Sequence, residues 1–407
     1  MDESVAQPAR RAALAFIFIT VLLDILAFGM IIPVLPHLIA GFLGGSFSKA
    51  AVWYGWFATV FMLMQFVCSP IQGALSDHFG RRPVILLSNL GLGVDFLFMA
   101  LVQSLPLLFL GRIISGITSA SFSTANAYLA DVTPPEKRAQ AFGMIGMAFG
   151  IGFVVAPAIG GWLGVVHPRL PFWIAAGLSL TNFCYGMFVL PESLPPERRS
   201  AFSWARANPL ASLRLLRGHP ELFGLASVLF LMALAHVVYP STFVLYADYR
   251  FHWDSSMAGN TLAFVGVLAV IVQGGLIKRF IARFGERRTL LIGLACGALG
   301  FTLYGFAPGG YWFWAAMPIA ALWGISGPAA QAIMTRHVSA QEQGRLQGAV
   351  GSLNSIAGIF GPTLFTRVFA GVATASVPMA FAGAGFWLAG AIVGLGGFVA
   401  WRVTRGE

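Results

Sequence analysis

The chain has 407 residues, of which 57 % are hydrophobic and only 10 % are charged. A soluble globular domain carries about 25 % charged residues, so this composition excludes an ordinary soluble protein. The formal net charge of +10 at pH 7 would suit a polyanion-binding protein only if the cations gathered on one exposed face, and their distribution along the chain therefore decides between partners.

The chain contains twelve apolar segments, each long enough for a helix to cross a hydrocarbon core about 30 Å thick. We expect spans at residues 14–35, 50–72, 83–104, 105–131, 139–163, 171–190, 220–247, 256–280, 288–307, 311–335, 344–369 and 376–401. The connections between them are short and leave no room for a separate soluble domain. The sequence therefore predicts an all-α integral membrane protein of twelve transmembrane helices.

The cations follow this topology when the amino terminus is placed in the cytoplasm. Lys49, Arg169, Arg250 and Arg367 then lie outside and Arg112 lies within a span, so 20 of the 25 Lys and Arg residues remain inside. This asymmetry is the positive-inside rule. It predicts two cytoplasmic termini, a lipid bilayer as the main partner, and no nucleic acid.

The two halves of the chain repeat each other at an offset of about 205 residues. Phe79-Gly80 recurs as Phe284-Gly285, Val132-Thr133 as Val338-Ser339, and Pro157 as Pro362. A constant offset of half the chain predicts two parallel six-helix repeats. We expect an N-terminal half at residues 1–190, a cytoplasmic linker with a short surface helix at 191–218, and a C-terminal half at 219–407.

Three charged residues fall deep inside the expected spans of the first half: Asp24, Asp95 and Arg112. Charges at this depth are costly and are functional candidates by default. Counting 1.5 Å per residue places all three at a similar height, so we expect a buried charge cluster. Burial favours a neutral carboxylic acid and a nearby guanidinium favours the carboxylate. We expect Asp24 to carry the proton, with Asp95 as a second titrating or substrate-facing group; a purely structural ion pair is the alternative.

The sequence offers no other energy source and no cofactor site. The three lysines, Lys49, Lys137 and Lys278, lack the glycines of a phosphate-binding loop. The three cysteines lack the spacing of a metal site, so we expect neither a metal nor a cofactor. Transport is therefore expected to be passive or ion-driven.

The segment at residues 73–84 follows the second expected span and forms a tight, glycine-bearing cytoplasmic turn. It resembles the loop motif of the major facilitator superfamily at each characteristic position. The resemblance implies the major facilitator fold and a cytoplasmic gate formed by Gly73, Asp77, Gly80, Arg81 and Asp131. The second copy departs from the motif, because Ala282 and Glu286 replace the aspartate and the arginine. Any latch is therefore expected to be asymmetric.

A second motif, at residues 152–161, resembles the antiporter motif of the drug/proton antiporters through Gly152, Pro157, Gly160 and Gly161. Ala156 stands where that motif usually has glycine. Over nearly its whole length the chain is similar to the tetracycline/proton antiporters. Those pumps carry a histidine in the eighth span and an aspartate in the ninth, where this chain has Ala269 and Gly297. The resemblance therefore implies the transport class but not tetracycline as the substrate.

Polar residues within the spans are candidates for substrate binding, and interhelical hydrogen bonding is the alternative for each of them. These candidates are Gln65, His236, Tyr239, Gln273, Gln331 and Asn354. His236 also adds a titratable group.

We expect a proton-coupled antiporter that exports small amphipathic compounds by alternating access, acting as a monomer in the cell (inner) membrane. A proton symporter or uniporter of a metabolite on the same fold is the nearest alternative. A non-transporting receptor or scaffold is an alternative of another class. An enzyme is not expected, because the sequence shows no nucleophile elbow, metal cluster or phosphate loop.

Overall fold

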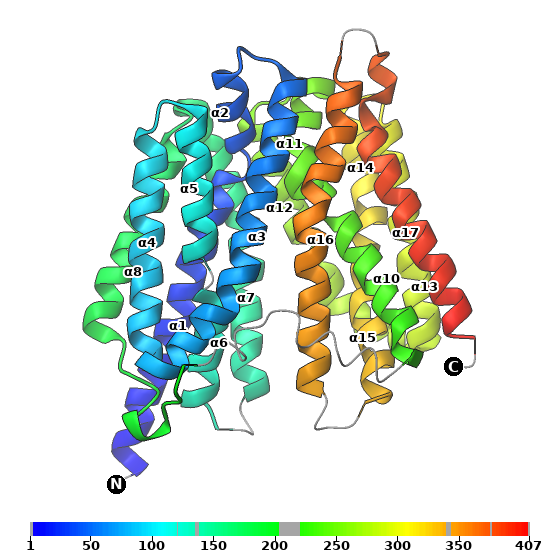
Figure 1. The fold of residues 1–407 in the computed structure, drawn as a ribbon. Coiled ribbons are helices and arrows are strands. Elements are labelled where there is room, and N and C mark those ends of the chain that lie inside the picture. Colours follow the sequence, from blue (N-terminus) through cyan, green and yellow to red (C-terminus); the bar gives the residue numbers. More distant parts are fainter. Residues whose placement is uncertain are drawn as a thin grey trace. The chain divides into compact units, whose positions relative to one another are not determined.

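The computed structural model describes residues 3–119, 121–134, 138–202, 220–338, 343–374 and 377–405. Within these ranges the chain is helical and contains no strand (Figure 1). The surface helix expected in the linker falls mostly on residues 203–219, outside the described residues. The helices of the first half are α1 (Glu3–Ile31), α2 (Leu35–Phe42), α3 (Phe47–Phe79), α4 (Arg81–Leu101), α5 (Leu105–Thr118), α6 (Ser121–Val132), α7 (Arg138–Val166), α8 (Leu170–Val189) and the short η2 (Pro196–Arg198). Those of the second half are α10 (Pro220–His236), α11 (Val238–Phe251), α12 (Ser255–Ile271), η4 (Val272–Leu276), α13 (Ile277–Phe306), α14 (Gly310–Ala321), η5 (Leu322–Ile325), α15 (Ser326–Arg336), α16 (Gln343–Val372), η6 (Met379–Gly383) and α17 (Ala384–Val403).

Among the described residues, ten helical stretches are long and apolar enough to cross a membrane. One of them, Ser255–Phe306, has 52 residues, or about 78 Å at 1.5 Å per residue, which is enough for two crossings of a core about 30 Å thick. Its chain turns at Gly285, where φ is 74°. Helices α5 and α6 supply one further crossing. The described part of the chain therefore confirms a twelve-span, all-α membrane fold.

Several expected spans are broken into two helices, and proline explains three of the breaks. Pro36, Pro240 and Pro328 each lie within the first three residues of the second helix, namely α2, α11 and α15. Proline lacks the N–H that would bond the carbonyl four residues earlier, and its ring clashes with that carbonyl. The preceding turn leaves the α-helix at residues 32–34, at Val237 and in the 3₁₀ turn η5. Pro70, Pro157, Pro318 and Pro362 lie inside helices, so proline favours a break without requiring one.

The chain forms two compact units that interleave along the sequence. Unit 1 comprises Met1–Leu35, Val60–Pro209 and Ser255–Ala263, and unit 2 comprises Pro36–Thr59, Leu210–Asp254 and Phe264–Glu407. Unit 2 thus contains α2 and the first part of α3 together with most helices of the second half. The predicted division into halves at residues 1–190 and 219–407 was based on the sequence repeat and not on contacts between helices. It stays a prediction.

In unit 1, α1 packs against α6, α7 and α8, and these contacts position the buried charges described below (Figure 1). Phe16, Val21, Ile25 and Tyr128 belong to an apolar cluster between these helices. On α7, a Cβ at Gly160 would collide with the backbone of Met30. Glycine at this position therefore allows α1 and α7 to approach closely.

Candidate functional site

The interior of unit 1 holds the three charged residues that the sequence analysis singled out. Asp24 on α1, Asp95 on α4 and Arg112 on α5 are 8 %, 1 % and 5 % exposed. A buried ionisable group in a membrane helix requires polar partners. The partners differ for the two carboxylates, so these three residues form two local environments.

Asp95 and Arg112 lie where α4 packs against α5. The hydroxyl of Ser115 donates to Asp95 Oδ2, and a Cβ at Gly111 would lie 3.3 Å from Asp95 Oδ1. The guanidinium of Arg112 acts electrostatically on Asp95 and also lies over the ring of Phe61, 4.4 Å from its centroid. The close helix contact at Gly111 thus brings a carboxylate, a hydroxyl and a cation together.

Asp24 faces a neutral amide. The side chain of Asn182 on α8 donates from Nδ2 to Asp24 Oδ1 at 3.3 Å, and its Oδ1 accepts a hydrogen bond from the Thr20 hydroxyl at 3.1 Å. Asn182 and Thr20 were not predicted from the sequence. A polar residue within an apolar span was the available signal, since buried polar side chains require partners.

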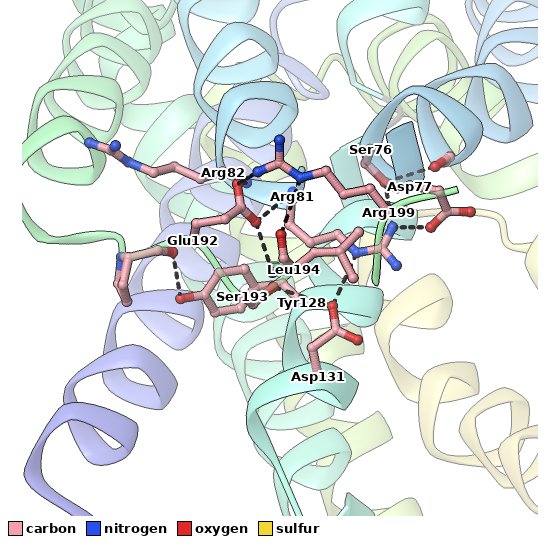
Figure 2. Close-up of polar contacts among 12 residues, drawn as sticks. Ser76, Asp77, Arg81, Arg82, Tyr128, Asp131, Glu192, Ser193, Leu194 and Arg199 are labelled. Atoms are coloured by element: carbon pink, nitrogen blue, oxygen red, sulfur yellow. Dashed lines mark hydrogen bonds and ion pairs between the residues drawn. The ribbon is translucent and has the colours of Figure 1, made fainter. Parts of the chain in front are cut away.

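The cytoplasmic turn between α3 and α4 forms a compact ionic cluster, shown in Figure 2. Arg81 is 9 % exposed, and its Nη1 lies 2.5 Å from Asp77 Oδ1 and 2.7 Å from Ser76 Oγ. Its Nε donates to Asp131 Oδ2 on α6 at 3.1 Å. The structure therefore brings together the three charged residues that the loop motif implied.

Glu192 completes this cluster from the segment that follows α8, and it was not singled out from the sequence. Its carboxylate accepts hydrogen bonds from the backbone N–H of Arg81 at 2.8 Å and of Arg82 at 3.3 Å (Figure 2). These are the first amides of α4, where the helix dipole favours a negative charge.

The two glycines of this turn differ. Gly80 has a φ of 106°, and a Cβ there would collide with the Glu192 carboxylate. At Gly73, no atom of the described residues, apart from its chain neighbours and the adjoining helix backbone, lies within 4 Å of the place that a Cβ would occupy, so packing does not require glycine there.

The second copy of the turn keeps an ion pair with its charges exchanged. Glu286 and Arg336 stand 205 residues after Arg81 and Asp131, and Arg336 Nη2 lies 2.6 Å from Glu286 Oε1. Glu286 stands where the first copy has Arg81, and Arg336 on α15 stands where the first copy has Asp131. The loss of the arginine from the motif is therefore matched by the loss of the aspartate. Each unit has its own pair between the interhelical turn and a neighbouring helix.

The antiporter motif on α7 provides close helix contacts within unit 1. A Cβ at Gly152 would collide with Ile25, and one at Gly161 would collide with the carbonyl of Ser255 at the start of α12. Pro157 lies inside α7, and its carbonyl limits the space at Gly259. The methyl group of Ala156 occupies the space beside Gly29, which explains how α7 accepts alanine at this motif position.

The substrate candidates fall in both units. Gln65 in unit 1 lies 3.5 Å from the hydroxyl of Ser119. In unit 2, Gln331 donates to Gln347 at 2.7 Å, while Asn354 and Gln273 are exposed, and Gln273 lies in the π-helical turn η4.

His236 and Tyr239 lie together at the break between α10 and α11. Their ring centroids are 6.1 Å apart, and the ring of Trp323 in η5 lies 5.8 Å from that of His236. Trp323 was not singled out from the sequence. A Cβ at Gly297 would lie 2.7 Å from its indole ring, so Trp323 occupies the space that a larger side chain at residue 297 would need. Ala269, the other departure, is half-buried on α12.

Comparisons with known proteins agree with this architecture. The sequence profile described as "Major Facilitator Superfamily" matches residues 17–362. The chain is 39 % identical over 362 residues to a tetracycline resistance protein, class C, from Escherichia coli, covering 89 % of this chain and 91 % of that protein. It is 36 % identical over 356 residues to a tetracycline resistance protein, class G, from Vibrio anguillarum, covering 87 % and 89 %.

Among solved structures, the fold is similar to that of the human organic anion transporter MFSD10. The TM-score is 0.69 at 25 % sequence identity, and the match covers 96 % of this chain and 99 % of that one.

Proposed function

The chain belongs to the Major Facilitator Superfamily, and from this premise we propose that it is a proton-coupled antiporter that exports amphipathic, tetracycline-like compounds. Family membership makes it an integral membrane transporter of a small molecule, and not an enzyme. The observation that carries the proposal is the burial of Asp24, Asp95 and Arg112 within a single unit. Buried carboxylates are groups able to exchange protons within the membrane.

Asp24 is the proposed proton carrier. Its partner is a neutral amide, so the carboxyl can exist with and without its proton without separating an ion pair. Asp95 differs, because Arg112 acts on it electrostatically and Ser115 donates to it. Asp95 and Arg112 therefore suit a second step, in which a substrate or a conformational change alters their mutual interaction.

The ionic cluster around Arg81 is the proposed cytoplasmic gate. Asp77, Asp131 and Ser76 hold the guanidinium, and Glu192 holds the start of α4 (Figure 2). A charge network at the cytoplasmic end of the helices favours one arrangement of the turn over others. Substrate passage on this side would require the network to rearrange.

The proposed substrate class comes from the relatives, which are named for tetracycline resistance. Within unit 2, His236, Tyr239 and Trp323 offer aromatic surface for an amphipathic compound. Position 297 is glycine and offers no carboxylate, and the indole of Trp323 occupies the space beside it. We infer that substrate selection differs from that of pumps with an aspartate at this position.

The same proposal includes location and assembly. Both termini are cytoplasmic in a cell (inner) membrane, and the transporter acts as a monomer. The distribution of Lys and Arg supports this orientation. A proton symporter or uniporter is distinguished by direction, because an antiporter moves its substrate against the inward flow of protons.

The test is tetracycline uptake into everted membrane vesicles under an imposed proton gradient, comparing the wild-type protein with Asp24→Asn. Uptake that depends on the gradient and is lost in Asp24→Asn supports the proposal. Gradient-dependent uptake that persists in Asp24→Asn removes Asp24 as the carrier. Wild-type vesicles that take up no tetracycline exclude this compound as a substrate, and a screen of amphipathic cations then follows.

A further inference from the structure

Asn182 is fully buried on α8, and its side-chain amide is engaged at both ends. Its nitrogen donates to Asp24 Oδ1 and to the backbone carbonyl of Thr20, at 3.3 Å in each case. Its oxygen accepts from the Thr20 hydroxyl at 3.1 Å. A backbone carbonyl can only accept a hydrogen bond, so the nitrogen end must face Thr20 and Asp24. The orientation of the amide is therefore fixed by α1.

The helices that pack against α1 bring few other charges toward Asp24. They are α6, α7 and α8, and α8 carries no Asp, Glu, Lys or Arg. The charged residues of α6 and α7 are Asp131, near the end of α6, and Arg138, at the start of α7. The other titratable side chains on these helices are Tyr128, Cys184 and Tyr185. Tyr128 bonds the carbonyl of Pro191, and Tyr185 stacks on Phe16, two turns along α1 from Asp24.

A buried proton carrier must be stable with and without its proton. A carboxylate with no partner is strongly destabilised by burial, and one paired with a fixed cation keeps its charge. A neutral amide donor lies between these limits. It stabilises the carboxylate by one hydrogen bond, and that bond weakens once the carboxyl is protonated.

We propose that Asn182, oriented by Thr20, is the positioning residue that sets the proton affinity of Asp24. This inference rests on the proposed role of Asp24 as proton carrier. Asn182 does not carry the proton; it acts through the carboxyl. Its effect is therefore expected in the pH dependence of Asp24, whereas a residue that only packs α8 against α1 would change stability alone.

Asn182→Leu removes the donor and keeps a side chain of similar size. The carboxylate of Asp24 then loses its hydrogen bond while the protonated form loses less, so Asp24 keeps its proton to a higher pH. One hydrogen bond to a charged group corresponds to a shift of about one to two pH units. Thr20→Val removes the hydroxyl that holds the amide oxygen of Asn182 and leaves the backbone carbonyl that accepts from its nitrogen. It is therefore expected to shift the midpoint in the same direction by less, and Thr20→Ser is expected to restore the wild-type value.

The experiment is a pH titration of the protonated-carboxyl infrared band, with purified full-length protein in lipid nanodiscs. The band of Asp24 is identified by its loss in Asp24→Asn. Thr302→Val is the matched control for Thr20→Val, because within the described part of the chain its hydroxyl bonds the carbonyl of Ala298 on its own helix. A higher midpoint in Asn182→Leu and in Thr20→Val, with Thr302→Val unchanged, supports the proposal.

A wild-type midpoint in Asn182→Leu overturns it, and if that variant does not fold, a wild-type midpoint in Asn182→Ala, which removes the same donor, overturns it in the same way. An unshifted Thr20→Val removes the orienting role of the Thr20 hydroxyl. The vesicle assay separates this outcome from a failure of the proposed function. Proton-driven uptake that persists in Asp24→Asn removes Asp24 as the carrier, whatever the infrared midpoints are. Uptake lost in Asp24→Asn together with an unshifted Asn182→Leu removes only the role of Asn182.

Discussion

The ion pairs Arg81–Asp131 and Glu286–Arg336 allow the stabilisation from a buried pair and from an exposed pair to be compared within one molecule. Arg81 and Asp131 are joined at 3.1 Å with 11 % and 27 % of their side chains exposed. Glu286 and Arg336 are joined at 2.6 Å, but 68 % of the Arg336 side chain is exposed. Solvent screens an exposed pair, and such pairs contribute about 0–1 kcal/mol.

The Arg81–Asp131 pair is expected to stabilise the protein more than the Glu286–Arg336 pair, because burial reduces this screening. Breaking a fully buried pair costs about 3–5 kcal/mol. Arg81 keeps Asp77 as a partner when Asp131 is changed, so we expect Asp131→Asn to cost about 1–2 kcal/mol. Double-mutant cycles of Arg81→Gln with Asp131→Asn should give a coupling energy of about 1–2 kcal/mol, against less than about 0.5 kcal/mol for Glu286→Gln with Arg336→Gln.

The assay is unfolding of the purified protein by SDS in mixed micelles, with both cycles measured at the same lipid content. A coupling energy for the Glu286 cycle equal to or larger than that of the Arg81 cycle would refute the argument from burial. The exchanged variant Glu286→Lys with Arg336→Glu provides a control, since it reverses the pair and should preserve most of its small coupling.

Three further predictions concern helix packing. Gly160→Ala should destabilise the protein by about 1–3 kcal/mol, because the new methyl group collides with the backbone of α1; Gly177→Ala, which meets open space, should leave the thermal midpoint unchanged. Gly297→Asp should displace the indole of Trp323 and change its fluorescence emission, and an unchanged spectrum would contradict the packing described here. Tyr54→Phe removes the 2.6 Å hydrogen bond from α3 to α11 in unit 2 and should raise the hydrogen exchange of α11; protection equal to the wild type would show that this bond does not hold the two helices.

The positions of the helices could be predicted from the sequence to a large extent. Apolar runs of sufficient length determine where a chain crosses a bilayer, because unpaired backbone groups cannot remain in hydrocarbon. A local rule favours the breaks before Pro36, Pro240 and Pro328, although Pro157 and Pro362 lie inside continuous helices. The expected spans were continuous at residues 220–247 and 311–335. The chemistry of proline was available in the sequence and was not used there.

The identity of the charged candidates was likewise a property of the sequence, because Asp24, Asp95 and Arg112 are charges in apolar surroundings. Their partners were decided by tertiary structure. Asn182 is 158 residues from Asp24, and Glu192 is 111 residues from Arg81. A polar residue in a span signals that it needs a partner, but only the packing of α8 against α1 determines which one it has.

In the second copy of the loop motif, too, the charged residues could be identified from the sequence but their pairing could not. Glu286 in place of Arg81 looked like the loss of a motif, since one position was considered without its partner. Arg336 restores the ion pair from another helix, and the two residues meet only in the folded chain. Composition and the length of the apolar runs thus determined the membrane fold and the type of each buried group, because these depend on local transfer energies. Tertiary packing decided which groups face each other, because hydrogen bonds and ion pairs require contact within a few ångströms between residues far apart in the chain.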